Sequence, residues 1–342
     1  MGEIIQLNNL NKNFNNEVNK LTALCHEDLE STNTLIIEKL DSNVPLIKEI
    51  ASYLILSGGK RLRPLLTACT FHLINRKKDN SKNYIGLAAA VEFIHAATLL
   101  HDDVIDDSKK RRGSLSANEV WGNKTSVLVG DFLFSRAFQL MTKYGNLEIL
   151  KILSDTSVVI SEGEVLELIN DKDLTINEDI YFKVINGKTA SLFSAACQVG
   201  GISANGSLKE IEAIKSFGTN FGMAFQLIDD AIDYSSSDEK LGKNIGDDFK
   251  EGKITLPIIL AYLRSNDEEK IFWNKNLVNL DQSPDDLAKA ILIIKKYNCI
   301  KDTIDRARHF TNVAIDSLET FENNEYRKTL MNLISASLNR FN

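Results

Sequence analysis

The 342-residue sequence has few residues that interrupt helices or cross-link chains. It contains only four prolines, which suits long helices because proline breaks a helix interior. Its four cysteines, Cys25, Cys69, Cys197 and Cys299, are widely scattered and form no C-x-x-C pair. Neither a disulfide framework nor a zinc site is therefore indicated. We expect a reduced, cytoplasmic protein.

The sequence also lacks a net positive charge and long apolar runs. The formal net charge is −7, which gives no sign of nucleic-acid binding. No uninterrupted stretch reaches the roughly 18 apolar residues of a membrane span, and the N-terminus is too polar for a signal peptide. The apolar content of 43% nevertheless supports a substantial core. We predict a soluble protein without a transmembrane segment or a nucleic-acid partner.

Helical periodicity prevails along nearly the whole chain, and alternating strand patterns bounded by Asn-Gly or Asp-Gly are absent. The stretches 85–101, 126–141 and 187–203 are apolar on most faces and belong in the middle of a bundle. No Pro-, Ser- or Gly-rich linker divides the chain, so we predict one all-α domain spanning 1–342. The expected helices cover 3–30, 31–57, 61–76, 82–107, 116–143, 146–169, 176–202, 207–234, 254–265, 284–297 and 299–340.

Two short acidic segments, 102–106 and 229–233, share the pattern D-D-x-x-D. An acidic run on a helix is usually just a solvated face, but both copies follow an apolar, helix-patterned stretch. Residues four apart share a helix face, and carboxylates leaving a buried helix are costly unless paired or metal-bound. Mg²⁺ is usually held by one or two carboxylates plus substrate phosphates. The expected metal ligands are Asp102, Asp103, Asp106, Asp229, Asp230 and Asp233.

Clustered cations accompany these carboxylates. Gly58–Pro64 contains Lys60, Arg61 and Arg63, and its glycines would let backbone approach an anion. Further groups are Lys109–Gly113, Lys188, and the lysines 243, 250 and 253 that follow the second acidic segment. Each group alone is more often a surface run. Together, two metal-binding walls and about six cations around an apolar interior suit a substrate with a diphosphate head and a hydrocarbon body.

These motifs resemble the trans-polyprenyl diphosphate synthases, and specifically the long-chain, octaprenyl diphosphate synthase-like group. The resemblance runs from about residue 46 to 257 and more loosely to the C-terminus. Its motifs are Gly58–Pro64, His95 to Asp106 with Arg111-Arg112-Gly113, Gly130-Asp131, Gly163-Glu164, Lys188-Thr189-Ala190, Phe225-Gln226 with Asp229–Asp233, and Gly242–Pro257.

The resemblance implies an all-α bundle around a deep cavity, a homodimer, and three Mg²⁺ per active site. Asp102 and Asp106 would hold two of the ions and Asp229 the third, with Asp233 facing the same region. Thr189 and Gln226 would steady the reacting allyl end. The allylic diphosphate would contact Arg111, Lys188 and Lys243; isopentenyl diphosphate would contact Lys60, Arg63, His95 and Arg112; Lys253 completes the substrate-binding set.

The implied reaction is repeated condensation of isopentenyl diphosphate onto an allylic diphosphate such as farnesyl diphosphate. The implied product is a long all-trans chain, C40 by our expectation, destined for a quinone side chain and delivered to membrane enzymes. The long-chain members place Gln where this chain has Glu167, whose charge would either join the metal shell or pair with a lysine.

The helix before Asp102 offers a ruler for product length. Ala97, Thr98 and Ile94 lie on the expected path of the growing tail, and the small side chains at 97 and 98 leave it open, whereas family members with short products carry aromatic residues there. A helix over 84–101 would run about 27 Å, which is room for several isoprene units. Phe132, Phe134 and Phe138 are candidates for the floor of the tunnel, and ordinary core packing is the alternative role for these side chains.

Other functions remain open at this stage. A shorter-chain (C15–C20) synthase or a terpene cyclase could use the same scaffold, although cyclases usually lack the Gly58–Pro64 segment. A non-catalytic subunit of a heteromeric synthase typically loses one aspartate motif, and this chain has both. A helical scaffold protein would give no reason for buried carboxylates and clustered cations to coexist.

Overall fold

The computed structural model describes residues 2–75, 82–235 and 246–340, and it is almost entirely helical. The helices are α1 Gly2–Leu24, α2 His26–Lys39, α3 Pro45–Leu56, α4 Leu62–Ile74, α5 Asn83–Ile105, α6 Ala117–Trp121, α7 Asn123–Tyr144, α8 Leu147–Ile169, α9 Glu178–Ile185, α10 Ser191–Ser203, α11 Leu208–Asp233, α12 Asp247–Glu251, α13 Leu256–Arg264, α14 Asp267–Trp273, α15 Asp286–Lys296, α16 Cys299–Ser317 and α17 Glu325–Leu338. The π-helical turns Asn186–Ala190 and Asn274–Val278 and the 3₁₀ turn Leu318–Thr320 complete the helical elements. The predicted all-α class is confirmed.

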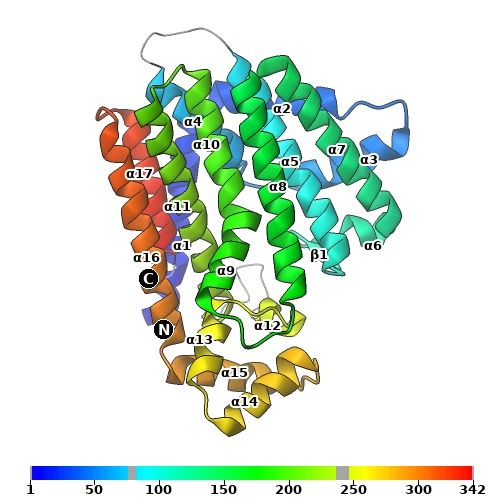
Figure 1. Cartoon of the computed structure of the whole chain (residues 1–342), viewed down its shortest axis with the longest axis vertical. Helices are drawn as coiled ribbons and strands as arrows, with labels where there is room; N and C mark the ends of the chain where they lie inside the picture. The colour runs from blue at the N-terminus through cyan, green and yellow to red at the C-terminus, as the bar shows by residue number, and fades with distance from the viewer. Residues whose placement is uncertain (1, 76–81, 236–245, 341–342) are drawn as a thin grey trace.

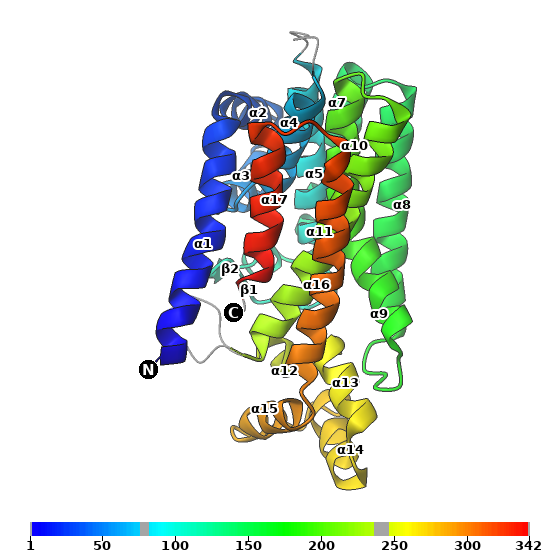
Figure 2. The same ribbon diagram turned by 90° about the vertical axis from the view of Figure 1, so that its left-hand side faces the viewer.

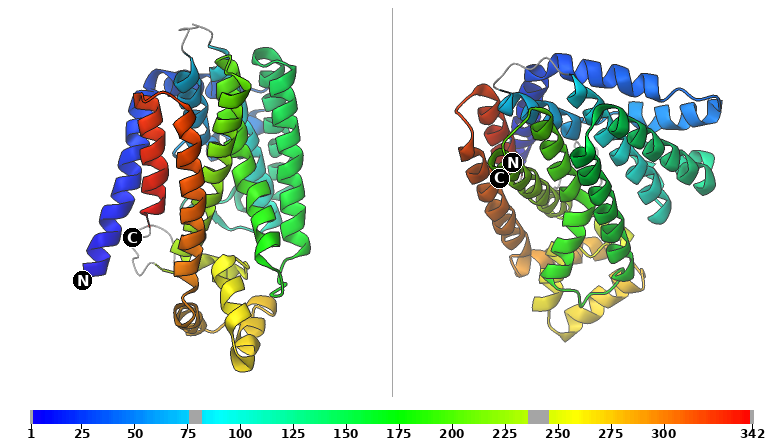
Figure 3. Two further views of the ribbon diagram at one scale, coloured as in Figure 1. Left: turned by 60° about the vertical axis from the view of Figure 1, so that its left-hand side comes forward. Right: turned by 45° about the horizontal axis from the view of Figure 1, so that its top comes forward.

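Most of the longer helices run along the long axis of the molecule, and α13–α15 form a small group beneath them (Figures 1 and 2). α5 packs against α7, α4, α2 and α10, while α11 packs against α10, α16 and α17. Figure 3 shows α1 and α17 at the edge of the bundle that carries both chain ends. All four cysteines are buried free thiols.

The central helix α5 is apolar because it is surrounded by protein. Among the described residues it is the one helix long and apolar enough to cross a membrane, but 78% of its apolar window is buried inside the bundle. It also carries the first acidic motif at its C-terminal end. These features are those of a core helix.

Several predicted helices are divided in the structure. The stretch 31–57 breaks before Pro45, which begins α3 because proline lacks the N–H that a helix interior requires. The stretch 116–143 breaks at Gly122, whose φ of +82° suits glycine. The long stretch 299–340 divides into α16 and α17. Within the stretch 3–30, α1 ends at Leu24 and α2 begins at His26. Prediction missed α14, which starts with a capping box between Asn266 and Glu269.

One small strand pair contradicts the expectation of no strands. β1 (Lys110–Arg111) pairs antiparallel with β2 (Ser114–Leu115). Both turn residues, Arg112 and Gly113, have positive φ (54° and 82°), as a type I′ turn requires. Strands of two residues are too short to show an alternating pattern, and the turn is Arg-Gly rather than Asn-Gly or Asp-Gly.

Candidate active site

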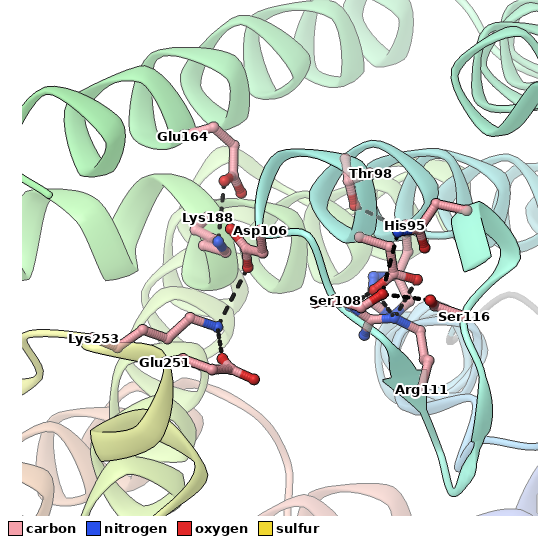
Figure 4. Close-up of polar contacts among 12 residues, drawn as sticks. His95, Thr98, Asp106, Ser108, Arg111, Ser116, Glu164, Lys188, Glu251 and Lys253 are labelled. Atoms are coloured by element: carbon pink, nitrogen blue, oxygen red, sulfur yellow. Dashed lines mark hydrogen bonds and ion pairs between the residues drawn. The ribbon is translucent and has the colours of Figure 1, made fainter. Parts of the chain in front are cut away.

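The two acidic motifs end α5 and α11 and lie at the same end of the bundle. The segment that follows α11 joins them. The backbone N–H of Asp248 donates to Asp233 Oδ2 at 3.2 Å, and Lys253 Nζ lies 3.3 Å from Asp106 Oδ2. Figure 4 shows Lys253 between Asp106 and Glu251, which is 2.9 Å away. The charge of Lys253 therefore holds the first motif beside the segment after the second.

The carboxylates of the first motif carry more negative charge than their neighbours neutralise. Burial, together with the nearby Glu164, raises the pKa of Asp102 to about 7, although Lys188 lowers it. Burial also raises the pKa of Glu164. A divalent cation would stabilise the ionised forms of Asp102 and Glu164, and carboxylate oxygens are the hard ligands that Mg²⁺ prefers. Within the described ranges, no three acidic, His or Cys side chains converge on one point.

Lys188 lies between this carboxylate group and the cavity beside the second motif. It belongs to the π-helical turn Asn186–Ala190, a geometry that is frequent at functional sites. The turn can approach α8 because Gly163 and Gly187 meet there: a Cβ on Gly163 would lie 3.0 Å from Gly187 Cα. Close backbone contact thus brings Lys188 to Glu164, which it faces in Figure 4.

Glu167 pairs with a lysine, one of the two roles expected for it. Lys188 Nζ donates to Glu167 at 2.7 Å and to Glu164 at 3.0 Å. Burial alone lowers the pKa of Lys188, but Glu167 and Glu164 raise it above its usual range, so the ammonium stays charged. With Thr189, Gln226 and Lys253, Lys188 lines a cavity of about 180 Å³.

The second aspartate of each motif turns toward the protein. Asp103 is 1% exposed, and its two carboxylate oxygens accept from Arg111 Nε at 2.7 and 2.8 Å. Asp230 accepts from Tyr181 Oη at 2.5 Å and from Gln226 Nε2 at 2.7 Å. Burial raises the pKa of Asp230 to about 7, while these two hydrogen bonds lower it.

Arg340, which sequence reasoning missed, contacts the first aspartate of the second motif. Its Nη1 lies 2.7 Å from Asp229 Oδ1, without the alignment of a hydrogen bond. Its guanidinium lies over the rings of Phe14 (5.1 Å) and Phe225 (5.3 Å). Lys60 Nζ lies 4.6 Å from the centre of the same Phe14 ring. No local pattern marks an arginine just after the last helix, because its site forms only when α17 packs beside α1.

The proposed isopentenyl-binding cations also gather in one place. Arg63 lies 4.2 Å from the centre of the Phe193 ring, and burial lowers its pKa to about 10. Its buried Nε has no hydrogen-bond partner. The guanidinium of Arg112 lies so close to Gly59 that a Cβ there would be 2.9 Å from Nη2. Burial and the charges of Arg63 and Arg112 lower the pKa of His95, so its imidazole is neutral near pH 7.

A buried ion pair that the sequence did not reveal anchors the Gly58–Pro64 segment. Arg61 pairs with the buried Glu92 of α5 and donates to the carbonyl of Ile55 at 2.5 Å. Arg61 has a left-handed φ of 47°, so these contacts hold an unfavourable backbone conformation in place. The anchor fixes the neighbouring residues 60 and 63 against α5. Lys243 lies outside the described residues.

The residues proposed for product length divide between the core and the surface. Ala97 and Ile94 are fully buried in α5, and Thr98 is half-buried and donates to the carbonyl of His95 at 2.9 Å. Phe132 is partly buried beneath Arg136, and Phe138 is 43% exposed on the outer face of α7. A ring exposed to solvent does not close a cavity within one chain, so this placement does not support Phe138 as the floor.

The fold and this site together define an isoprenoid synthase: an all-helical enzyme with two acidic motifs opposite clustered cations. Comparison with known proteins agrees. A family model described as polyprenyl synthetase matches residues 44–294. Octaprenyl diphosphate synthase of Escherichia coli K12 is 39% identical over 324 residues, covering 95% of this chain and 98% of that protein. The chain therefore belongs to the polyprenyl synthetase family and is a trans-prenyltransferase of the long-chain type.

Two solved structures share both fold and sequence with this chain. Polyprenyl synthase from Caulobacter crescentus CB15, complexed with calcium and isoprenyl diphosphate, has a TM-score of 0.89 and 43% identity, covering 95% of this chain and 98% of that chain. A decaprenyl diphosphate synthase from Rhodobacter capsulatus has a TM-score of 0.90 and 42% identity, covering 95% and 99%. The relatives thus include proteins named for different product lengths.

Proposed function

We propose that this enzyme condenses isopentenyl diphosphate repeatedly onto farnesyl diphosphate to make all-trans octaprenyl (C40) diphosphate for a quinone side chain. The observation that supports the proposal is that both acidic motifs end helices at the same end of the bundle, where Lys188 pairs with Glu164 and Lys253 pairs with Asp106. The small side chains of Ala97 and Thr98 precede Asp102 on the same helix. The Escherichia coli relative named octaprenyl diphosphate synthase supports C40 over the shorter products.

The carboxylates fit the three Mg²⁺ ions that we propose. Asp102 and Asp106 would hold two ions and Asp229 the third, with Asp233 facing the same region. Burial raises the pKa of Asp102 to about 7, and Asp229 Oδ1 is buried with a contact to Arg340 but no hydrogen bond, so both carboxylates can accept a metal ion. When bound, the ions would neutralise the negative charge of the departing diphosphate.

The chain's own residues would then place the two substrates. Lys188, Arg111 and Lys243 would bind the allylic diphosphate, and Lys253 completes the substrate-binding set. Lys60, Arg63 and Arg112 would bind isopentenyl diphosphate, while neutral His95 would give a hydrogen bond rather than charge. Thr189 and Gln226 would lie beside the allylic carbon that becomes cationic. The isopentenyl double bond attacks that carbon, and the proton is lost to the departing diphosphate. Apolar walls keep water from the cation.

Incubating the purified protein with farnesyl and isopentenyl diphosphates and Mg²⁺ tests the function directly. The mass of the dephosphorylated products should centre on C40. A main product of C15–C20 would establish the shorter-chain alternative. No product at all would favour the non-catalytic subunit, which both intact acidic motifs argue against.

Arg63 gives a sharper test of substrate assignment. Arg63→Ala should raise the isopentenyl KM by about 10- to 100-fold, because a charge-assisted contact to a diphosphate contributes about 1.5–3 kcal/mol. The allylic KM should change by less than about threefold, since Lys188 and Arg111 are untouched. Steady-state kinetics with each substrate varied in turn decides. Equal changes in both KM values would contradict the assignment.

We also propose a single-domain, cytoplasmic homodimer. α7 and α8 expose apolar side chains, including Leu128, Val158, Val165 and Leu168. A second copy would cover such a face, as in other symmetric dimers. Sedimentation at micromolar concentration should show a dimer that reductant does not dissociate, because every cysteine is a buried free thiol. A monomer under these conditions would contradict the proposal.

A further inference from the structure

Asp230 ends a continuous line of hydrogen bonds from the cavity. Thr189 Oγ1 donates to Gln226 Oε1 at 3.0 Å. Gln226 Nε2 in turn donates to Asp230 Oδ1 at 2.7 Å, and Tyr181 Oη donates to the other oxygen at 2.5 Å. Asp230 is 4% exposed, so its two oxygens are committed to these partners. All four residues line the 180 Å³ cavity beside the acidic motifs.

The carboxylate sets the direction of every donor in this line. Asp230 accepts at both oxygens, from Tyr181 Oη at one and from Gln226 Nε2 at the other, so the Gln226 side that faces Asp230 is the NH₂ group. The amide oxygen then faces Thr189 and takes the hydroxyl hydrogen. The remaining lone pairs of Thr189 Oγ1 are left for whatever lies in the cavity. An oxygen lone pair fixed in this orientation stabilises positive charge that develops beside it.

We propose that Asp230 is a positioning residue rather than a metal ligand: through Gln226 it turns the Thr189 lone pairs toward the allylic cation, and Tyr181 holds the carboxylate in place. This inference rests on the prenyl-transfer function proposed above. It separates Asp230 from Asp229, whose carboxylate is beside it in sequence but contacts Arg340, which follows α17, instead.

An amide in place of the Asp230 carboxylate no longer fixes the orientation of the Gln226 amide and the Thr189 hydroxyl. The side chain that Asp230→Asn introduces can donate through its own NH₂, so Gln226 can flip and present its NH₂ to Thr189. The hydroxyl of Thr189 then has no acceptor in the amide, and its hydrogen turns toward the cavity, where it opposes a cation. The expected defect is therefore in the ionisation step rather than in diphosphate binding.

The experiment compares Asp230→Asn and Asp229→Asn with the wild type in two measurements. In steady-state kinetics, D230N should lower kcat by about 10- to 100-fold, the scale of one oriented dipole at a developing charge. Both KM values and the Mg²⁺ concentration for half-maximal rate should change by less than about twofold. In calorimetry, D230N should bind inorganic pyrophosphate with Mg²⁺ as tightly as the wild type, and D229N should bind it at least about tenfold more weakly.

Coupling to Thr189 distinguishes positioning from a general structural defect. Thr189→Val keeps the shape but removes the hydroxyl through which Asp230 acts. In the T189V background, D230N should therefore reduce kcat by less than about twofold, a non-additivity that a merely structural role would not produce. Effects that multiply, or a D230N protein that binds Mg²⁺-pyrophosphate as weakly as D229N, would overturn the proposal.

Tyr181→Phe carries the same test if D230N does not fold. It keeps the carboxylate but removes one of its two anchors, so kcat should fall by several-fold when Thr189 is present and stay unchanged in the T189V background. A fall of equal size in both backgrounds would overturn the proposal. Failure of the function itself looks different, because the wild type would then form no product, while the calorimetric comparison would still show whether Asp230 holds metal.

Discussion

Replacing Asp102 or Asp229 with alanine should reduce turnover by about a thousandfold or more. Each change removes a carboxylate that would hold metal against the departing diphosphate, and such charge stabilisation is worth several kcal/mol. Asp102 is 8% exposed and lies in a group whose carboxylates exceed the available cations. EDTA should abolish turnover in the wild type, and added Mg²⁺ should restore it. Steady-state kinetics measures each effect.

A surface aspartate provides the matched control. Asp155 lies on α8 and pairs with Lys151 one helical turn away, where both side chains are largely exposed. Asp155→Ala should leave turnover within about twofold of the wild type, because exposed ion pairs contribute little. Circular dichroism should show that D102A and D229A remain folded. Undiminished turnover in both would eliminate the pair of facing metal-binding walls.

Ala97→Tyr should shorten the main product from about C40 to about C15–C20. Ala97 is fully buried in α5, about one and a half helical turns, or roughly 7 Å, before Asp102. A ring there would block the path of the tail below the metal site while leaving the carboxylates and cations unchanged. Ionisation and the first condensations should therefore continue. Mass spectrometry of the dephosphorylated alcohols measures the product distribution.

Ala90→Tyr supplies a graded comparison on the same helix. Ala90 is also fully buried, and it lies about two turns, or roughly 10 Å, farther from Asp102 than Ala97 does. If the tail follows α5, the A90Y product should be longer than that of A97Y by about two isoprene units. Thermal melts control for overpacking, which costs about 1–3 kcal/mol in a core. Unchanged products in both variants would show that the tail takes another route.

The sequence pattern by itself determined the class of the fold and located both acidic motifs. The apolar periodicity around 85–101 and 187–203 correctly predicted central helices, because burial on most faces leaves a record in every turn. The D-D-x-x-D spacing within 102–106 and 229–233 located both acidic motifs, because residues four apart lie on the same face of a helix. The sequence analysis did not predict the break before Pro45, although the residue itself signals it, since proline is favoured in the first turn of a helix.

Only the tertiary structure decided what each polar side chain contacts. Within one motif, Asp102 stays beside Glu164 whereas Asp103 turns to Arg111, and spacing along a helix does not distinguish them. Asp229 meets an arginine 111 positions later in the chain (340 minus 229). The outward placement of Phe138 likewise followed from which side of α7 met α5. Periodicity reports which residues share a face, but partners from distant helices become neighbours only when those helices pack.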